Sequence, residues 1–330
     1  MFNKIYSKTK EFIKENLFFI VLPFIVVGTL SFPLPYYVEA PGGIIDLNGK
    51  VNVKNGYKQS GSLNITYVSS YDGNIGTYLI SKINKSWDLV PSSKVEVGTE
   101  TRKDVNVRNK ILLENSLSNA YYVAYKSLNK EVDIKKSNIQ VLFITENADT
   151  NLETGDTIKK IDDIVIENTD DILEYLSTKN IGDKLKVIVN EKEEKYIKVG
   201  TAGGVKSLNI SVICNYDYND DVVFKFTNGE SGPSGGLMIS LSIYNQNTKE
   251  DITKGKKVVG TGTIDLEGNV GEIGGIKHKI IGAVKGGAEV FLLPYENYEE
   301  AEEVVKTHNY NIKLVPVKTF NEAIEYLKNN

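Results

Sequence analysis

Ser234 is the residue of this sequence best placed to act as a nucleophile. It lies in the Gly- and Ser-rich loop 228–236, which runs directly into an apolar segment predicted to be a helix over 237–244. A serine at a helix N-terminus has an accessible hydroxyl, and the neighbouring backbone N–H groups can stabilise a developing oxyanion. The same loop is also typical of a simple N-cap, in which the hydroxyl only accepts a backbone N–H. The loop alone leaves both interpretations open.

Most other catalytic and binding chemistries lack the residues that they need. The chain has only two histidines, His278 and His308, both expected at the surface, so an HExxH zinc helix is excluded and a Ser-His-Asp triad is poorly supported. The single cysteine, Cys214, excludes a disulfide framework and a multi-thiolate metal site. No GxxxxGK[ST] loop is present, and a formal net charge of −4 provides no basic surface for nucleic acid. We therefore expect no cofactor, no metal, and neither nucleotide nor nucleic acid as a partner.

Two segments together resemble the serine-lysine peptidase domain of the Lon family. They are ESGPSGG, at 230–236, and TGTIDLEGNVGEIGGIKHKIIGAVKGGAEVFLLP, at 261–294. In that family a serine in a GPSxG loop is paired with a lysine in a GG-apolar-K segment. The resemblance implies Ser234 as nucleophile and Lys277 as general base, at the separation expected of the family. The supporting residues that it implies are Thr261, Gly232, Pro233 and Gly235.

A lysine can act as general base only when its amine is neutral. An ordinary lysine has a pKa of about 10.4 and is protonated at neutral pH, whereas burial can lower that value by about 3 to 5 units. We therefore expect Lys277 to be desolvated, at the start of a predicted helix over 277–285. Lys279 and Lys285 are expected to be ordinary exposed lysines. The neutral amine would take the Ser234 proton and later protonate the leaving amine of a cleaved peptide.

Residues 131–201 are predicted to form a unit of their own. Strands expected over 139–144, 157–161 and 184–189 accompany a helix over 170–176, and the stretch beginning NLETGDTIKK resembles a PDZ domain of the bacterial protease-associated type. The resemblance implies a groove between the first strand and the helix, in which a peptide adds as a further strand. A small structural insert without a ligand is the other interpretation. The peptide-binding residues implied are Ile139, Val141, Phe143 and Ile172.

The N-terminal segment 17–37 is predicted to cross a membrane as a helix. No charged residue lies between Glu15 and Glu39, and about 20 apolar residues suffice to span a bilayer. Lysines at positions 4, 8, 10 and 14 precede the segment, so the positive-inside rule predicts that residues 1–16 form a cytoplasmic tail. A removable signal peptide and a buried core helix are the alternatives.

In its order of parts the whole chain resembles the membrane-anchored, PDZ-containing Lon-like serine proteases of Gram-positive bacteria. The resemblance implies an α+β fold in which the PDZ-like unit is inserted between two parts of the peptidase domain, 42–130 and 202–330. The function implied is an ATP-independent endopeptidase that cleaves flexible peptides or exposed loops of proteins outside the cell membrane, with the PDZ-like unit binding or gating substrate. The resemblance leaves a homo-oligomer open. The alternative is a catalytically inactive, PDZ-type peptide-binding scaffold.

Overall fold

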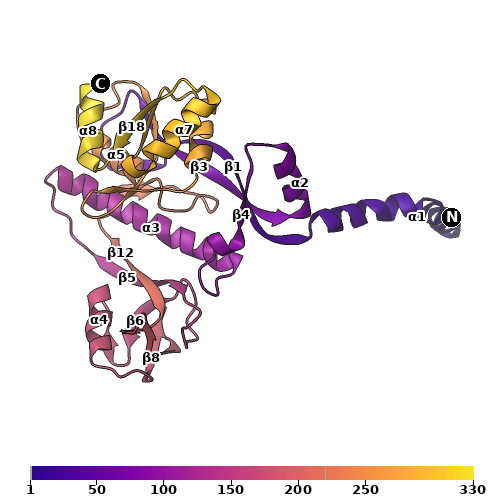
Figure 1. Ribbon diagram of the computed structural model, residues 1–330, viewed down its shortest axis with the longest axis horizontal. Coiled ribbons are helices and arrows are strands. Elements are labelled where there is room, and N and C mark those ends of the chain that lie inside the picture. Colours follow the sequence, from indigo (N-terminus) through magenta and orange to yellow (C-terminus); the bar gives the residue numbers. More distant parts are fainter. Residues whose placement is uncertain (1, 220) are drawn as a thin grey trace. The chain divides into compact units, whose positions relative to one another are not determined.

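The computed structural model describes residues 2–219 and 221–330, without the side chains of residues 2–4 (Figure 1). The chain divides into two compact units. The anchor unit comprises the residues up to Pro41 together with Ser69–Lys94, and the main unit comprises Gly42–Val68 together with Val95–Asn330. Both units contain helices and strands, so the mixed α and β content expected from the sequence is confirmed.

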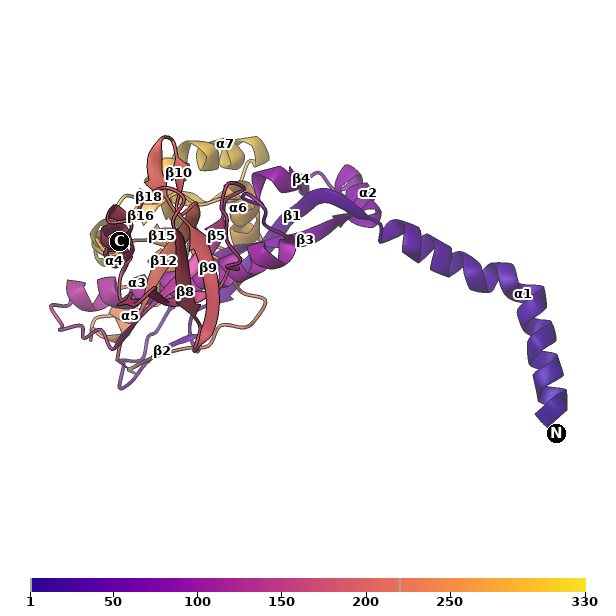
Figure 2. The ribbon, with the colours of Figure 1, turned by 90° about the horizontal axis from the view of Figure 1, so that it is seen from below.

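The anchor unit begins with one long apolar helix, α1 (Phe2–Leu30). Residues Ile5–Leu30 are long and apolar enough to cross a membrane, with a mean hydropathy of 1.8, and none of that apolar stretch is buried. Pro23 lies inside α1, and the helix is bent along its length (Figure 2). An internal proline removes one helical hydrogen bond and commonly causes such a bend.

The end of α1 corrects the predicted membrane segment 17–37. The helix ends at Leu30, and the chain then forms β1 (Pro33–Asp46), which pairs antiparallel with β4 (Asp88–Pro91). Two prolines near the start of β1 have no backbone N–H to donate to the hydrogen bonds of a continuing helix, and this favours the extended conformation there. At the other end, the residues predicted as a separate tail, from 2 to 16, belong to the same helix.

A short helix completes the anchor unit. β3 (Ser62–Asn74) leads directly into α2 (Ile75–Ile83), which begins with a capping box between Asn74 and Thr77. In this box each residue's side chain accepts the other's backbone N–H, so two otherwise unpaired donors are satisfied. None of the residues of α2 is buried.

The main unit is organised around a sheet whose strands come from both ends of the chain. The strand order is β18-β17-β14-β3-β1, in which β14 runs parallel to β3 and β17, and β17 runs parallel to β18. One hydrophobic core joins residues of β3, α3, α5 and α8, and α3 packs along α5. The strands are β14 (Lys257–Gly260), β17 (Val290–Pro294) and β18 (Lys313–Val317), and the helices are α3 (Arg102–Ser127), α5 (Gly236–Gln246), α6 (Ile276–Lys285), α7 (Tyr298–His308) and α8 (Phe320–Asn329).

A second core lies in the inserted unit, which we define as residues 136–217. Its strands are ordered β12-β5-β6-β8-β9, and Ile, Val and Leu side chains of these strands and of α4 fill the core. The predicted boundary at residue 201 is wrong, because β12 pairs antiparallel along the whole of β5 and therefore belongs to this sheet. The elements are β5 (Lys136–Ile144), β6 (Thr157–Ile161), α4 (Thr169–Ser177), β8 (Lys184–Val189), β9 (Glu193–Lys198) and β12 (Ile210–Asp217).

Short strand pairs complete the main unit. They are β2 (Val51–Val53) with β13 (Val222–Phe224), β15 (Thr263–Ile264) with β16 (Val270–Gly271), β10 (Gly200–Ala202) with β11 (Val205–Ser207), and β7 (Ile164–Val165) with β6.

A buried ion pair in the inserted unit gives a stability prediction. Lys195 Nζ lies 2.9 Å from Asp156 Oδ2, and their side chains are 7% and 6% exposed. Lys195→Ala leaves a buried carboxylate without its partner, which typically costs about 3–5 kcal/mol. We expect amides of β5 and β6 to exchange with deuterium at least about a hundredfold faster. The control is Lys198→Ala, since the Lys198–Asp149 pair is exposed and is expected to contribute less than about 1 kcal/mol. Equal effects of the two variants would contradict the prediction.

Candidate functional site

Ser234 lies immediately before α5, in a loop that the rest of the main unit holds in place. The N-cap residue of α5 is Gly235, and its cap has no side-chain hydrogen bond. The Ser234 hydroxyl is therefore not the cap of this helix, and the N-cap interpretation of the sequence does not hold. The side chain is half-buried, which leaves it accessible from one side.

A lysine amine contacts the Ser234 hydroxyl, and it belongs to Lys279. Lys279 Nζ donates to Ser234 Oγ at 2.7 Å and to Thr261 Oγ1 at 2.9 Å. The Thr261 hydroxyl in turn donates to the Ser234 carbonyl oxygen at 3.0 Å. Lys279 is 3% exposed and Thr261 is fully buried. The three side chains thus form one connected cluster, in which the amine lies away from bulk water.

This geometry corrects the prediction that Lys277 is the partner of Ser234. Lys277 is on the first turn of α6, but it is only partly buried. Successive residues of an α-helix are about 100° apart, so residues 277 and 279 point in nearly opposite directions. Lys279, which the sequence suggested to be an ordinary surface lysine, is the one that faces the core. The expected separation of the pair was therefore two residues too short.

The helical pattern of α6 contains the signal that distinguishes the two lysines. Ile276, Lys279, Ile280 and Ala283 follow the i, i+3, i+4, i+7 spacing of one helix face, and all four are buried. Lys277 shares its side of the helix with Val284, which is partly buried, and with Lys285, which is exposed. A lysine at a core position of an amphipathic helix is unusual, and that anomaly is visible in the sequence.

The supporting residues predicted from the sequence have definite structural roles. Gly232 has a positive φ of 90°, a conformation that favours glycine, and its N–H donates to the Asn109 carbonyl oxygen at 2.8 Å. The Pro233 carbonyl oxygen accepts the Ser116 hydroxyl at 3.0 Å. A Cβ at Gly235 would approach Ile239 to 3.3 Å, so the helix start is closely packed there. Residues of α3 therefore fix the loop that carries Ser234.

The loop that carries Ser234 also forms hydrogen bonds with the segment that follows β14. The Ser234 carbonyl oxygen accepts the Gly262 N–H at 2.8 Å as well as the Thr261 hydroxyl, and the Leu237 N–H donates to the Gly262 carbonyl oxygen at 3.1 Å. Thr261 itself is tied to the sheet, because its N–H donates to the Leu292 carbonyl oxygen of β17 at 2.9 Å. The cluster of Ser234, Thr261 and Lys279 is thus positioned by backbone hydrogen bonds as well as by packing.

A cleft of about 420 Å³ opens beside Ser234. Its apolar lining comes from β1, β3, α3, α5 and the loop after β13. One polar atom stands out, because Thr66 Oγ1 is buried without a hydrogen-bond partner among the residues that the structure describes. A buried hydroxyl that lacks a partner is energetically costly, and here it belongs to the lining of the cleft. The lining residues include Ile44, Ile65, Leu113, Phe226, Ile239 and Ser234.

Glu230, one of the residues that line the cleft, forms an ion pair with Lys50. Lys50 Nζ lies 2.7 Å from Glu230 Oε1, and Glu230 also accepts the Thr227 N–H at 2.6 Å. Burial opposes ionisation of this carboxyl group, but the hydrogen bonds from Lys50 and Thr227 hold the pKa of Glu230 below its ordinary value. Glu230 therefore stays ionised at neutral pH, with its charge balanced by Lys50.

The inserted unit does not offer the peptide groove predicted from the sequence. Ile139, Val141 and Ile172 are buried in the core of the unit, and Phe143 is only partly exposed. The edge of β5 is occupied, since β12 pairs with it from Ile144 to Lys136. A strand whose two edges are already paired cannot accept a further strand. The prediction of peptide binding along β5 is therefore wrong for this conformation of the chain.

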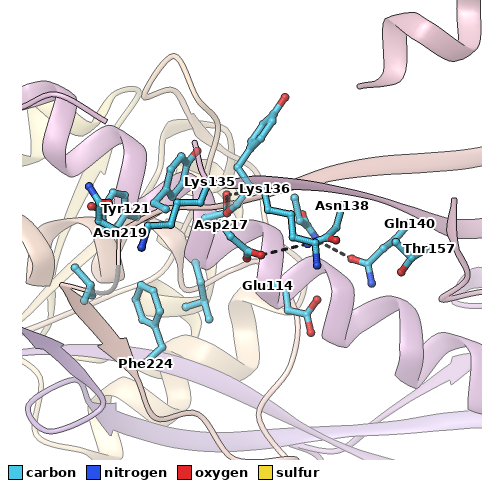
Figure 3. A pocket seen from close by; sticks show the side chains of 16 residues that line it. Glu114, Tyr121, Lys135, Lys136, Asn138, Gln140, Thr157, Asp217, Asn219 and Phe224 are labelled. Atoms are coloured by element: carbon cyan, nitrogen blue, oxygen red, sulfur yellow. Dashed lines mark hydrogen bonds between the residues drawn. The ribbon is translucent and has the colours of Figure 1, made fainter. Parts of the chain in front are cut away.

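A larger cavity, of about 770 Å³, lies where α3 approaches β5, β12 and β13 (Figure 3). Its lining is mixed, with Glu114, Lys135, Lys136 and Asp217 among aromatic and amide side chains. Burial, together with the charge of Asp217, raises the pKa of Glu114 above its ordinary value. The cavity and the cleft share one element, because neighbouring residues of α3 line both: Leu113 in the cleft and Glu114 here.

Solved structures that resemble part of the chain include two small domains from Listeria. One is the crystal structure of the PDZ domain of an SdrC-like protein of Listeria monocytogenes. Its sequence is 20% identical to this chain and the TM-score is 0.22, and the match covers 25% of this chain and 94% of that chain. The other is the solution structure of the second domain of a Listeria protein, at 24% identity and a TM-score of 0.20, covering 26% of this chain and 89% of that chain.

The part of the chain that carries the Ser234 cluster matches a known family. Residues 219–329 match the family described as the Lon protease (S16) C-terminal proteolytic domain. Similar proteins include the Lon proteases of Neorickettsia sennetsu, 36% identical over 97 residues, and of Trichlorobacter lovleyi, 34% identical over 96 residues. Each alignment covers 29% of this chain and 12% of the relative, so the chain spans only a small part of the relatives that it matches. The predicted resemblance to Lon peptidases is confirmed, because the C-terminal third of this chain is similar to the proteolytic domain of that family.

Proposed function

We propose that the chain is a membrane-anchored endopeptidase in which Ser234 is the nucleophile and Lys279 is the general base. The observation that carries the proposal is the 2.7 Å contact between Lys279 Nζ and Ser234 Oγ. This distance is within the range of about 2.6–3.2 Å that direct proton transfer requires. The match of residues 219–329 to a proteolytic domain supports the same assignment.

Thr261 defines which way the amine faces. The Thr261 hydroxyl donates a hydrogen bond to the Ser234 carbonyl oxygen. The lone pairs of the hydroxyl oxygen can therefore accept an N–H from Lys279. A neutral lysine has one lone pair. When one N–H of this neutral amine is donated to Thr261, the lone pair can point toward the Ser234 hydroxyl, 2.7 Å away, and accept its proton. Burial disfavours the charged form of an amine, so the dry surroundings of Lys279 favour the form that the reaction needs.

The reaction then follows from the cluster. Lys279 takes the Ser234 proton as the oxygen attacks a peptide carbonyl, and the resulting ammonium protonates the leaving amine. Water hydrolyses the acyl-enzyme. The Gly236 and Leu237 N–H groups already donate to the carbonyl oxygens of Pro233 and Gly262. An oxyanion site at this helix start would therefore use the N–H groups that precede them, at Ser234 and Gly235.

The substrates that we propose are flexible peptides and exposed loops of proteins. The sequence has no GxxxxGK[ST] loop for nucleotide, so cleavage would be independent of ATP. Aliphatic and aromatic side chains make up about half of the cleft lining, with Ile44, Ile65 and Ile239 among them. These side chains support the binding of an apolar substrate residue next to the cleaved bond. We propose neither nucleotide nor nucleic acid as a partner.

We further propose that α1 anchors the enzyme and that the peptidase lies outside the cytoplasm. The length and hydropathy of Ile5–Leu30 support the anchor. The lysines at positions 4, 8, 10 and 14, without nearby lysine or arginine after the apolar segment, support this orientation.

We propose that the inserted unit gates access to the catalytic cleft rather than binding peptide along β5. The support is α3, which carries Leu113 in the cleft and Glu114 in the cavity next to the inserted unit. α3 also holds the Ser234 loop through Asn109 and Ser116. The alternative of an inactive peptide-binding scaffold has less support, because β12 already pairs with the edge of β5 along which the peptide was expected to bind.

The first prediction concerns the two lysines. In the full chain, Ser234→Ala and Lys279→Met should abolish cleavage of a fluorogenic peptide, with loss of the general base lowering kcat by about 10²–10⁴-fold or more. Lys277→Met, the matched control two residues away, should keep kcat within about twofold, since a partly exposed lysine contributes little to stability. Full activity of Lys279→Met, with loss of activity in Lys277→Met, would restore the assignment made from the sequence.

The second prediction concerns Thr261 as a positioning residue. Thr261→Val removes the acceptor of the Lys279 N–H and leaves a buried amine without that bond, which typically costs about 1–3 kcal/mol. We expect kcat to fall by about 10- to 100-fold with little change in KM, and the rate to be restored in Thr261→Ser. A change in KM alone would show that Thr261 acts on substrate binding instead.

The third prediction concerns the cleft. Digestion of a mixture of unfolded peptides, analysed by mass spectrometry, should show cleavage next to large aliphatic residues, with acidic residues strongly disfavoured at the same position. Val68→Lys places a positive charge in the cleft lining and should increase cleavage next to acidic residues. Cleavage that ignores the neighbouring residues in both proteins would contradict the role of the cleft.

A further inference from the structure

The anchor unit carries an apolar surface on α2 that no other part of the described chain covers. Leu79, Ile80 and Ile83 are 49%, 46% and 85% exposed. These residues lie three and four positions apart, so they share one side of the helix. A contiguous exposed apolar face of this kind usually marks an interaction surface.

This face begins where the membrane-spanning candidate ends. The Ile75 N–H, at the start of α2, donates to the Phe32 carbonyl oxygen at 3.2 Å. A Cβ at Gly76 would lie only 3.4 Å from the Leu30 carbonyl oxygen, so α2 starts in close contact with the last residue of α1. Figure 1 shows α2 next to this end of α1. Phe32 follows the end of α1 and accepts the first N–H of α2, and its side chain is 61% exposed.

The side chains around α2 are those that favour a membrane–water interface. Tyr71 and Trp87 stack with ring centroids 5.4 Å apart, and Tyr71 is 45% exposed. Lys82 lies over the ring of Tyr78, with Nζ 5.0 Å from the ring centroid. Tyrosine and tryptophan concentrate at the headgroup level of bilayers, and lysines there favour anionic lipids. Lys82 and Lys85 are both exposed.

We propose that α2, together with Phe32, Tyr71 and Trp87, lies in the headgroup layer of the membrane as a second contact beside α1. The proposal rests on the anchoring role of α1 proposed above. Any bilayer that α1 crosses ends close to Leu30, where α2 begins, so lipid is the partner that geometry places next to this face. A second copy of the chain is the alternative occupant. A helix lying in the interface would stop the enzyme from rotating freely about a single tether.

Trp87 is the only tryptophan of the chain, so its fluorescence tests the proposal directly. The full chain is reconstituted into vesicles of phosphatidylcholine and phosphatidylglycerol whose acyl chains are brominated near the headgroup. We expect loss of most of the Trp87 emission relative to vesicles without bromine, because quenching requires contact with the acyl chains. Ile83→Asp should restore much of the emission. The control is Ile181→Asp, a similarly exposed position in the inserted unit, which should leave the quenching unchanged.

The outcomes separate this inference from the proposed function. Carbonate extraction of the same vesicles tests the anchor, and cleavage of a fluorogenic peptide tests the Ser234 site. If the chain stays in the membrane and cleaves peptide but Trp87 emission is unaffected by bromine, the proposal is overturned. If Trp87 of the wild type is not quenched, and Ile83→Asp lowers the particle mass of the protein, a second copy of the chain is the occupant of this face. Equal quenching in wild type and Ile83→Asp would also overturn the role of α2.

Discussion

The buried contact between the Lys279 amine and the Ser234 hydroxyl is the constraint on which the rest of the main unit depends. An amine has to be kept out of water to favour its neutral form, yet its nitrogen still needs hydrogen-bond partners. The structure meets both needs with one residue, Thr261, whose hydroxyl accepts from Lys279 while it donates to the Ser234 backbone. The proposed catalytic cluster is therefore also a structural cluster, which connects α6 to the loop before α5.

α3 is the element that connects this cluster to the rest of the chain. It fixes the Ser234 loop through Asn109 and Ser116, lines the cleft through Leu113, and borders the cavity next to the inserted unit through Glu114. The helix precedes the inserted unit in the sequence, whereas Ser234 and Lys279 follow it. Residues on both sides of the insertion therefore have to come together before the site exists.

Much of this arrangement could be predicted from the sequence, and the failures have physical reasons. Strong local patterns predicted the long helix α3 and the loop before α5 that carries Ser234. The choice of Lys277 failed because it relied on the distance from a glycine pair, whereas the direction of a side chain depends on its position around the helix. The β12 pairing was missed because contacts between distant strands leave no local pattern. The end of α1 was placed too late because uncharged residues continue into β1, although Pro33 and Pro35 mark the change.

The most direct test of the account is the protonation state of Lys279 in the active full chain. Lysine labelled with ¹³C at Cε gives resonances that shift as each amine titrates, and Lys279→Met identifies the one from Lys279. We expect this amine to be neutral already at a pH at which the exposed lysines are still charged. This expectation would be contradicted if, in protein that cleaves peptide, the Lys279 resonance titrated together with those of the exposed lysines, near the ordinary value of about 10.4.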